Sequence, residues 1–147
     1  MSFPLDPDTV SHGIQLAVAP VFLLTAVSGM IGTVANRLAR IIDRARTLEE
    51  RITLAGDSDA SRHHYVELAA LRTRGLLANG SIGLLTLCSF LIGLTIIVLF
   101  LGEINNFQNL RIAMVSFLSG VACFLLALVC FMVETLIATR LLNFSKL

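Results

Sequence analysis

The chain has 147 residues, of which 56% are hydrophobic and only 14% are charged. A soluble globular domain is roughly 45–50% apolar and about 25% charged, so this composition argues against a soluble protein. The formal net charge of +1 predicts no nucleic-acid partner, because binding to nucleic acid needs a clear excess of positive charge.

Three segments, residues 9–36, 75–102 and 112–133, contain no Asp, Glu, Lys or Arg. A membrane-spanning helix needs about 20 mainly apolar residues, and backbone groups in hydrocarbon must be satisfied inside the segment. The sequence therefore predicts an all-α membrane protein with three transmembrane helices. We expect one membrane domain over residues 1–147, with spans at 10–35, 80–102 and 112–136.

Residues 1–9 are expected to form an outer N-terminal segment. Asp6 is a suitable N-cap for a helix that begins at Pro7. No Lys or Arg precedes Arg37, so the first apolar segment lacks the basic start of a signal peptide and is interpreted as a retained span. In a symmetric oligomer, Asp6 and Asp8 could also form an acidic outer mouth that concentrates cations; the alternative is helix capping.

Eight of the eleven Lys and Arg residues lie between residues 37 and 74, which connect the first two spans. Basic residues collect on the cytoplasmic side of membrane proteins, so this connection is predicted to be cytoplasmic. The predicted tail, residues 137–147, contains Arg140 and Lys146 and is placed on the same side. The predicted outer loop, residues 103–111, has only Arg111, so the N-terminus is expected outside and the C-terminus inside.

The connection itself, residues 36–76, has the pattern of a long antiparallel helical hairpin. No Gly or Pro occurs from residue 33 to residue 55, so the first helix is expected to continue past the membrane. Residues 56–61 have the composition of a turn, a second helix should return from Arg62, and the glycines of residues 75–83 predict a bend where it re-enters the membrane. The apolar residues of the first arm follow the 3-4 spacing of a coiled coil: Leu38, Ile41, Ala45, Leu48, Ile52 and Ala55.

Polar and small residues form a stripe along one face of the first span. One interpretation is a dry seam, because small residues let membrane helices approach closely and polar side chains bond between helices. The other is that copies of this face surround a water-filled path. Both favour self-association. The stripe consists of Ser11, Gln15, Val18, Phe22, Thr25, Gly29, Gly32 and Asn36.

Charged residues at the predicted inner surface give two further candidates. A basic collar of arginines is either a topological signal that contacts anionic lipid headgroups, or part of an ion vestibule or lipid-regulated switch. Glu134 lies at the inner end of the third span, where a carboxylate is costly unless it is paired. We expect a salt bridge from Glu134 to one of two collar residues, Arg37 or Arg40; the alternatives are an exposed position among the lipid headgroups and a proton-carrying role. The collar consists of Arg37, Arg40, Arg72 and Arg74.

Motifs for catalysis or metal binding are absent from the sequence. No nucleophile–base pairing, HExxH or glycine-rich phosphate loop occurs. His63 and His64 are adjacent, so on a helix they point about 100° apart and cannot easily hold one metal ion. All three cysteines lie in the apolar segments. We therefore expect no enzyme activity, no cofactor and no metal site.

Residues 19–26, APVFLLTA, and residues 36–49, NRLARIIDRARTLE, resemble a bacterial membrane-protein family known as domain of unknown function 2721. The resemblance covers nearly the whole chain. It implies a three-helix protein of the bacterial inner membrane, and it implies no activity for any residue.

Three spans in a single copy offer little interior for a transport site and leave the polar stripe facing lipid. The sequence therefore favours a homo-oligomeric, channel-like membrane protein in which the first helix lines a central axis. Its expected partners are membrane lipids, further copies of the chain and, in the channel interpretation, ions. The alternative is a non-conducting scaffold or regulator whose cytoplasmic hairpin binds a protein partner or anionic lipid.

Overall fold

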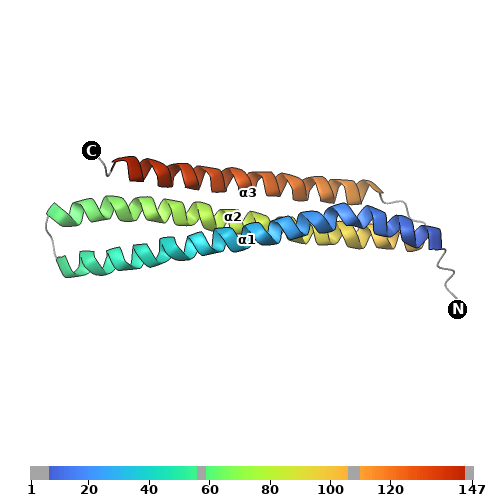
Figure 1. Cartoon of the computed structure of the whole chain (residues 1–147), viewed down its shortest axis with the longest axis horizontal. Coiled ribbons are helices and arrows are strands. Elements are labelled where there is room, and N and C mark those ends of the chain that lie inside the picture. The colour runs from blue at the N-terminus through green and yellow to red at the C-terminus, as the bar shows by residue number, and fades with distance from the viewer. Residues whose placement is uncertain (1–6, 56–58, 106–109, 145–147) are drawn as a thin grey trace. The chain divides into compact units, whose positions relative to one another are not determined.

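A computed structural model describes residues 7–55, 59–105 and 110–144, with side chains at 11, 13–54, 64–102 and 111–139. These residues form three α-helices: α1 (Pro7–Ala55), α2 (Asp59–Asn105) and α3 (Leu110–Phe144) (Figure 1). Each helix contains a segment long and apolar enough to cross a membrane. The protein is therefore a multi-pass, all-helical membrane protein, as its composition predicts.

All three helices extend beyond the charge-free segments. α1 begins at Pro7 and continues through Pro20 to Ala55. α3 continues to Phe144, beyond the predicted end of the third span. The backbone hydrogen-bond ladder of a helix does not need to stop at the membrane surface, so helix ends do not mark span ends. The span limits drawn from the sequence stay predictions.

α2 differs most from the sequence-based expectation. It begins at Asp59, three residues before the predicted start at Arg62, and an acidic residue suits the first turn of a helix. α2 also continues as one helix through the glycines of residues 75–83, where the sequence predicts a bend. α2 ends at Asn105 and α3 begins at Leu110, and the outer loop expected over 103–111 stays a prediction, because helix ends do not mark span ends.

The chain divides into two compact units. The first unit comprises Met1–Met30 and Leu84–Leu125, and the second comprises Ile31–Gly83 and Leu126–Leu147. Each unit therefore contains a part of all three helices.

In the first unit, small and hydroxyl side chains bring the helices together. A Cβ atom added to Gly120 of α3 would lie 3.0 Å from Cδ1 of Ile92 on α2, so the two helices approach closely there. Ser116 Oγ donates a hydrogen bond to the Leu91 carbonyl at 3.0 Å, and Thr95 Oγ1 donates to the same oxygen at 2.8 Å. These contacts are typical of helices packed inside a membrane. Buried side chains here include Ala17, Val27, Leu85, Cys88, Ile92 and Ala113.

In the second unit, α1 and α2 form an antiparallel hairpin around an apolar cluster. Outside this seam, Arg44 pairs with Glu67 at 2.7 Å, and Arg72 pairs with Glu49 at 3.4 Å. The predicted apolar seam is thus confirmed over most of its length, while supercoiling and a cytoplasmic location stay predictions. The cluster comprises Ile41, Leu48, Leu68 and Leu71, with Ala45 and Ile52 packed against it.

Candidate functional site

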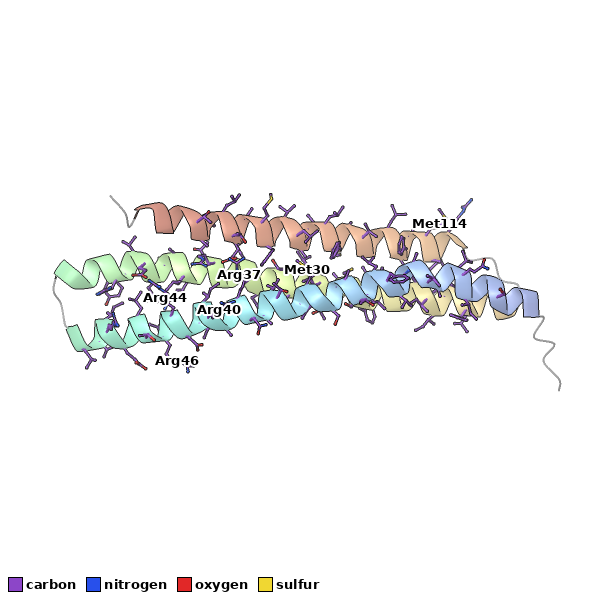
Figure 2. The ribbon with its side chains drawn as sticks, viewed as in Figure 1. Met30, Arg37, Arg40, Arg44, Arg46 and Met114 are labelled. Carbon is purple, nitrogen blue, oxygen red and sulfur yellow. The ribbon has the colours of Figure 1, made fainter. Side chains whose placement is uncertain are left out.

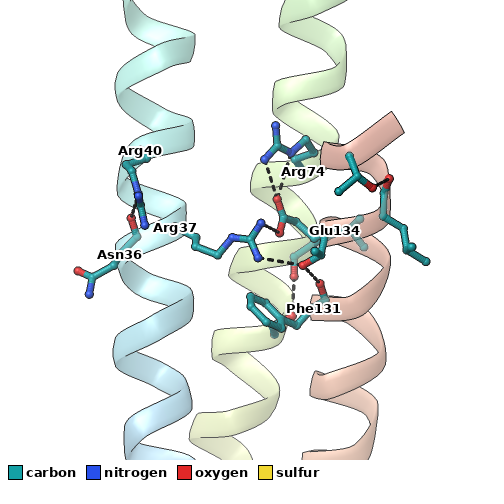
Figure 3. A network of polar contacts seen from close by, with 11 residues as sticks. Asn36, Arg37, Arg40, Arg74, Phe131 and Glu134 are labelled. Atoms are coloured by element: carbon teal, nitrogen blue, oxygen red, sulfur yellow. Dashed lines mark hydrogen bonds and ion pairs between the residues drawn. The ribbon is translucent and has the colours of Figure 1, made fainter. Parts of the chain in front are cut away.

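The second unit contains a fully buried carboxylate, Glu134 of α3, whose side chain has an exposed fraction of 0%. Arg74 of α2 donates two hydrogen bonds to Glu134 Oε1, from Nε at 3.0 Å and from Nη2 at 2.9 Å (Figure 3). A buried charge is costly unless it is paired and hydrogen-bonded. The arginine of α2 therefore compensates the acid of α3.

Arg37 of α1 approaches the same carboxylate from the other side. Its Nη2 lies 3.3 Å from Glu134 Oε2, which has no hydrogen-bond partner among the described residues, so this contact is an ion pair only. Arg37 Nη1 donates to Thr135 Oγ1 at 2.9 Å, and its guanidinium carbon lies 5.1 Å from the centre of the Phe131 ring. The Thr135 hydroxyl in turn donates to the Phe131 carbonyl at 2.9 Å. Arg37 of α1 and Arg74 of α2 thus both contact Glu134 of α3, so the network joins all three helices (Figure 3).

Next to this network, α1 and α2 enclose a groove of about 550 Å³. We call it the arginine groove, because four of its six lining residues are arginines. Within the described part of the chain, Arg37 and Arg74 share the carboxylate of Glu134, and Arg44 pairs with Glu67. The lining residues are Arg37, Arg40, Ile41, Arg44, Leu71 and Arg74.

The structure brings together three of the four residues of the predicted basic collar. Arg37, Arg40 and Arg74 line the arginine groove, whereas Arg72 pairs with Glu49 and does not line it. Arg44, which was not assigned to the collar, lines the groove from α1. Arg72 and Arg74 are two positions apart on α2, and residues two apart on a helix do not share a face. Arg74 can therefore line the groove while Arg72 does not.

The polar stripe of α1 is exposed in both units. In the first unit, Gln15, Phe22, Thr25 and Gly29 are exposed; in the second, so are Gly32 and Asn36. A Cβ atom added to Gly29 or Gly32 would meet nothing within 4 Å, so a side chain at either position has open space among the described residues of one copy. Of the predicted outer acids, Asp6 and the side chain of Asp8 lie outside the described residues.

Comparison with known families gives one match. The family model described as "Protein of unknown function (DUF2721)" matches residues 17–144. The chain belongs to this family. The match includes the Glu134 network and the arginine groove, and the family description assigns no activity to them. No curated protein and no solved structure matches the chain.

The expected salt bridge of Glu134 is confirmed for Arg37 but not for Arg40. Arg40 Nε instead donates to the backbone carbonyl of Asn36, one turn earlier on α1, at 3.4 Å. The sequence placed Arg74 at the same predicted membrane surface as Glu134 but did not single it out as the hydrogen-bonding partner, because only the packing of α2 against α3 decides which arginine of the collar reaches the acid. The signal in the sequence was the position of Glu134 at the inner end of an apolar segment, which predicts an arginine partner at that level but not that two arginines share the acid.

A second cavity, of about 300 Å³, lies nearer the end of the hairpin and is lined in part by Arg44, His64 and Glu67. His64 is half-buried, and its Nδ1 has no hydrogen-bond partner among the described residues. The side chain of His63 is outside the described part. Within that part, no group of three His, Cys, Asp or Glu residues is arranged to hold a metal ion.

Proposed function

We propose that this protein is a homo-oligomeric, channel-like protein of the bacterial inner membrane, in which α1 of each copy lines a central axis. The exposure of the polar stripe carries this proposal. Gln15, Thr25 and Asn36 of α1 are exposed among the described residues of the same copy.

Facing lipid is unfavourable for the amide side chains of Gln15 and Asn36, because in hydrocarbon they lose their hydrogen bonds to water, whereas the Thr25 hydroxyl already donates to the Val21 carbonyl at 3.2 Å. Copies of α1 around an axis would remove the stripe from lipid. Gly29 and Gly32, which have open space around them, would let the copies approach closely. The weakly polar side chains could then replace part of the hydration of a passing ion.

In this proposal the hairpin is cytoplasmic and the N-terminus is outside. The support is the block of arginines between the first two spans. The proposed function involves no enzyme activity and no cofactor, and the conducted species are ions.

The test is to replace Gly29 or Gly32 with Leu in the full chain. A leucine side chain at either position should fill the axis or separate the helices, so ion flux in liposomes should fall to background or the oligomer mass should decrease. Gly80→Leu is the matched control: a Cβ atom there also meets nothing within 4 Å, but the residue is on α2. If both α1 variants assemble and conduct like the wild type, α1 does not line the axis.

A second candidate is a non-conducting scaffold whose hairpin binds a protein partner or anionic lipid. Exposed apolar side chains on the hairpin favour it, because Leu54, Tyr65 and Val66 are 87%, 58% and 69% exposed. Reconstituted oligomer distinguishes the two functions. If it passes no ion at any pH or membrane tension, the channel function is excluded and the scaffold remains.

A further inference from the structure

We infer that the arginine groove binds the phosphate of an anionic phospholipid headgroup, with Arg40 as the side chain that recognises it. This inference names the site and the chemical group through which the second candidate function would bind lipid. It rests on that candidate only for the location of the lipid at the hairpin. It does not require a conducting path.

The charges around the groove leave an excess of positive charge. Its four arginines face two carboxylates: Glu134, shared by Arg37 and Arg74, and Glu67, which pairs with Arg44. Counting one charge for each group gives a net charge of +2 for the groove and its partners. A phosphate bearing one or two negative charges complements this excess.

Arg40 is the groove arginine with the most unused hydrogen-bonding capacity. It is exposed, and among the described residues it has no carboxylate partner. Its one hydrogen bond, from Nε to Asn36, uses one of the five N–H donors of a guanidinium. The remaining donors match the bidentate geometry in which arginine binds phosphate.

The position of the groove along the helices selects a lipid rather than a soluble anion. The charge-free run of α1 ends immediately before Arg37, and the charge-free run of α2 begins immediately after Arg74. Both ends are expected at the boundary between hydrocarbon and water, where the phosphates of phospholipids lie. Ile41 and Leu71 provide an apolar floor beside the arginines.

The experiment uses the full chain in an uncharged detergent, titrated with dihexanoyl phosphatidylglycerol, dihexanoyl phosphatidylcholine or inorganic phosphate. Phosphatidylcholine has the same acyl chains and phosphate, but its choline cancels the charge. We expect phosphatidylglycerol to bind at least about tenfold more tightly than either other probe. Arg40→Gln should weaken its binding by about tenfold, because a charge-assisted contact is lost.

Arg46→Gln is the matched control. It removes the same charge from an exposed arginine of α1 that does not line the groove, and Figure 2 shows Arg46 on the side of α1 away from Arg44. Its affinity for phosphatidylglycerol should stay within about twofold of the wild type. Neither arginine pairs with a carboxylate in the described part, so neither change removes an ion pair needed for folding.

Three results would overturn the inference. Equal weakening by the two variants would show a general surface-charge effect. Inorganic phosphate bound as tightly as phosphatidylglycerol would exclude the lipid as occupant, and no preference over phosphatidylcholine would exclude recognition of charge. Native mass spectrometry of the same samples reports lipid occupancy and oligomer size separately. A wild-type oligomer that stays intact but binds no phosphatidylglycerol would likewise refute lipid binding by the groove, whereas a wild-type monomer that binds it would refute only the proposed assembly.

Discussion

The two units hold their helices together by different means. In the first unit, Gly120 allows α2 and α3 to approach closely, and Ser116 bonds to a backbone carbonyl of the neighbouring helix. In the second unit, two arginines from different helices converge on Glu134. The first kind of contact needs no charge, whereas the second depends on charges that are partly shielded from water. The comparison indicates that uncharged contacts hold the helices of the first unit together, whereas ion pairs contribute in the second.

The difference follows the distribution of charge in the sequence. The first unit draws its described residues mainly from charge-free segments, where close packing and short hydroxyl bonds are the available interactions. The second unit includes the arginine block, whose long cationic side chains are stabilised by acidic partners or by a bound anion. Substitutions at the contacts of each unit measure how much stability each kind of interaction contributes.

The largest effect is expected for Glu134→Ala. This change leaves Arg37 and Arg74, whose side chains are only 28% and 18% exposed, without their shared acid. Removing one partner from a buried ion pair costs about 3–5 kcal/mol, and the partial exposure of the arginines places the expected loss near the low end. Denaturant unfolding in a mild detergent, followed by circular dichroism, measures it.

Glu134→Gln separates charge from shape in the same assay. Glutamine keeps a carbonyl acceptor for Arg74 and nearly the same volume, so its loss should be smaller than that of alanine. A change of less than about 0.5 kcal/mol for alanine, the range of ordinary surface substitutions, would mean that the network does not stabilise the second unit.

Much of the architecture could be predicted from the sequence, because it depends on local patterns. The three charge-free segments predict three apolar helices, Pro7 marks the start of α1, and the spacing of Ile41, Ala45 and Leu48 predicts the face that packs in the hairpin. Helix lengths were less predictable. A helix stops where its hydrogen bonds find other partners, and composition alone does not locate that point.

The candidate site was only half predictable. Glu134 stood out because a carboxylate in an apolar segment requires a partner, and Arg37 was one of two residues expected to pair with it. Arg74 and the arginine groove depend on how α2 lies against α1 and α3 within the second unit, and no sequence spacing encodes that. The separation of Arg72 from Arg74 also shows why a cluster of basic residues in sequence need not form one cluster in space.

A smaller effect is expected for Gly120→Leu in the first unit. The added Cβ would lie 3.0 Å from Ile92 Cδ1 and 3.5 Å from Leu91 Cβ, so α2 and α3 must separate or Ile92 must change its rotamer. Overpacking of this kind costs about 1–3 kcal/mol. Replacing glycine with leucine also raises the helix propensity of the position, which offsets up to about 1 kcal/mol, so we expect a loss of stability in the lower half of that range. The same unfolding assay measures it.

Gly93→Leu is the control within the first unit. A Cβ atom at Gly93 meets nothing within 4 Å, so its effect should be smaller than that of Gly120→Leu. Equal losses at the two glycines would contradict the role assigned to close approach at Gly120, and would point instead to a general intolerance of bulk along these helices.

The smallest effect is expected for Glu49→Gln, which removes the partner of Arg72. The two side chains are 53% and 71% exposed and their charged atoms are 3.4 Å apart, so water screens most of their attraction. Exposed pairs contribute about 0–1 kcal/mol, and raising the salt concentration to about 1 M should abolish the difference from the wild type. A loss close to that of Glu134→Ala would mean that ion pairs stabilise the second unit regardless of burial. The contrast with Glu134 therefore tests whether burial, rather than the number of charged pairs, determines how strongly an ion pair holds these helices together.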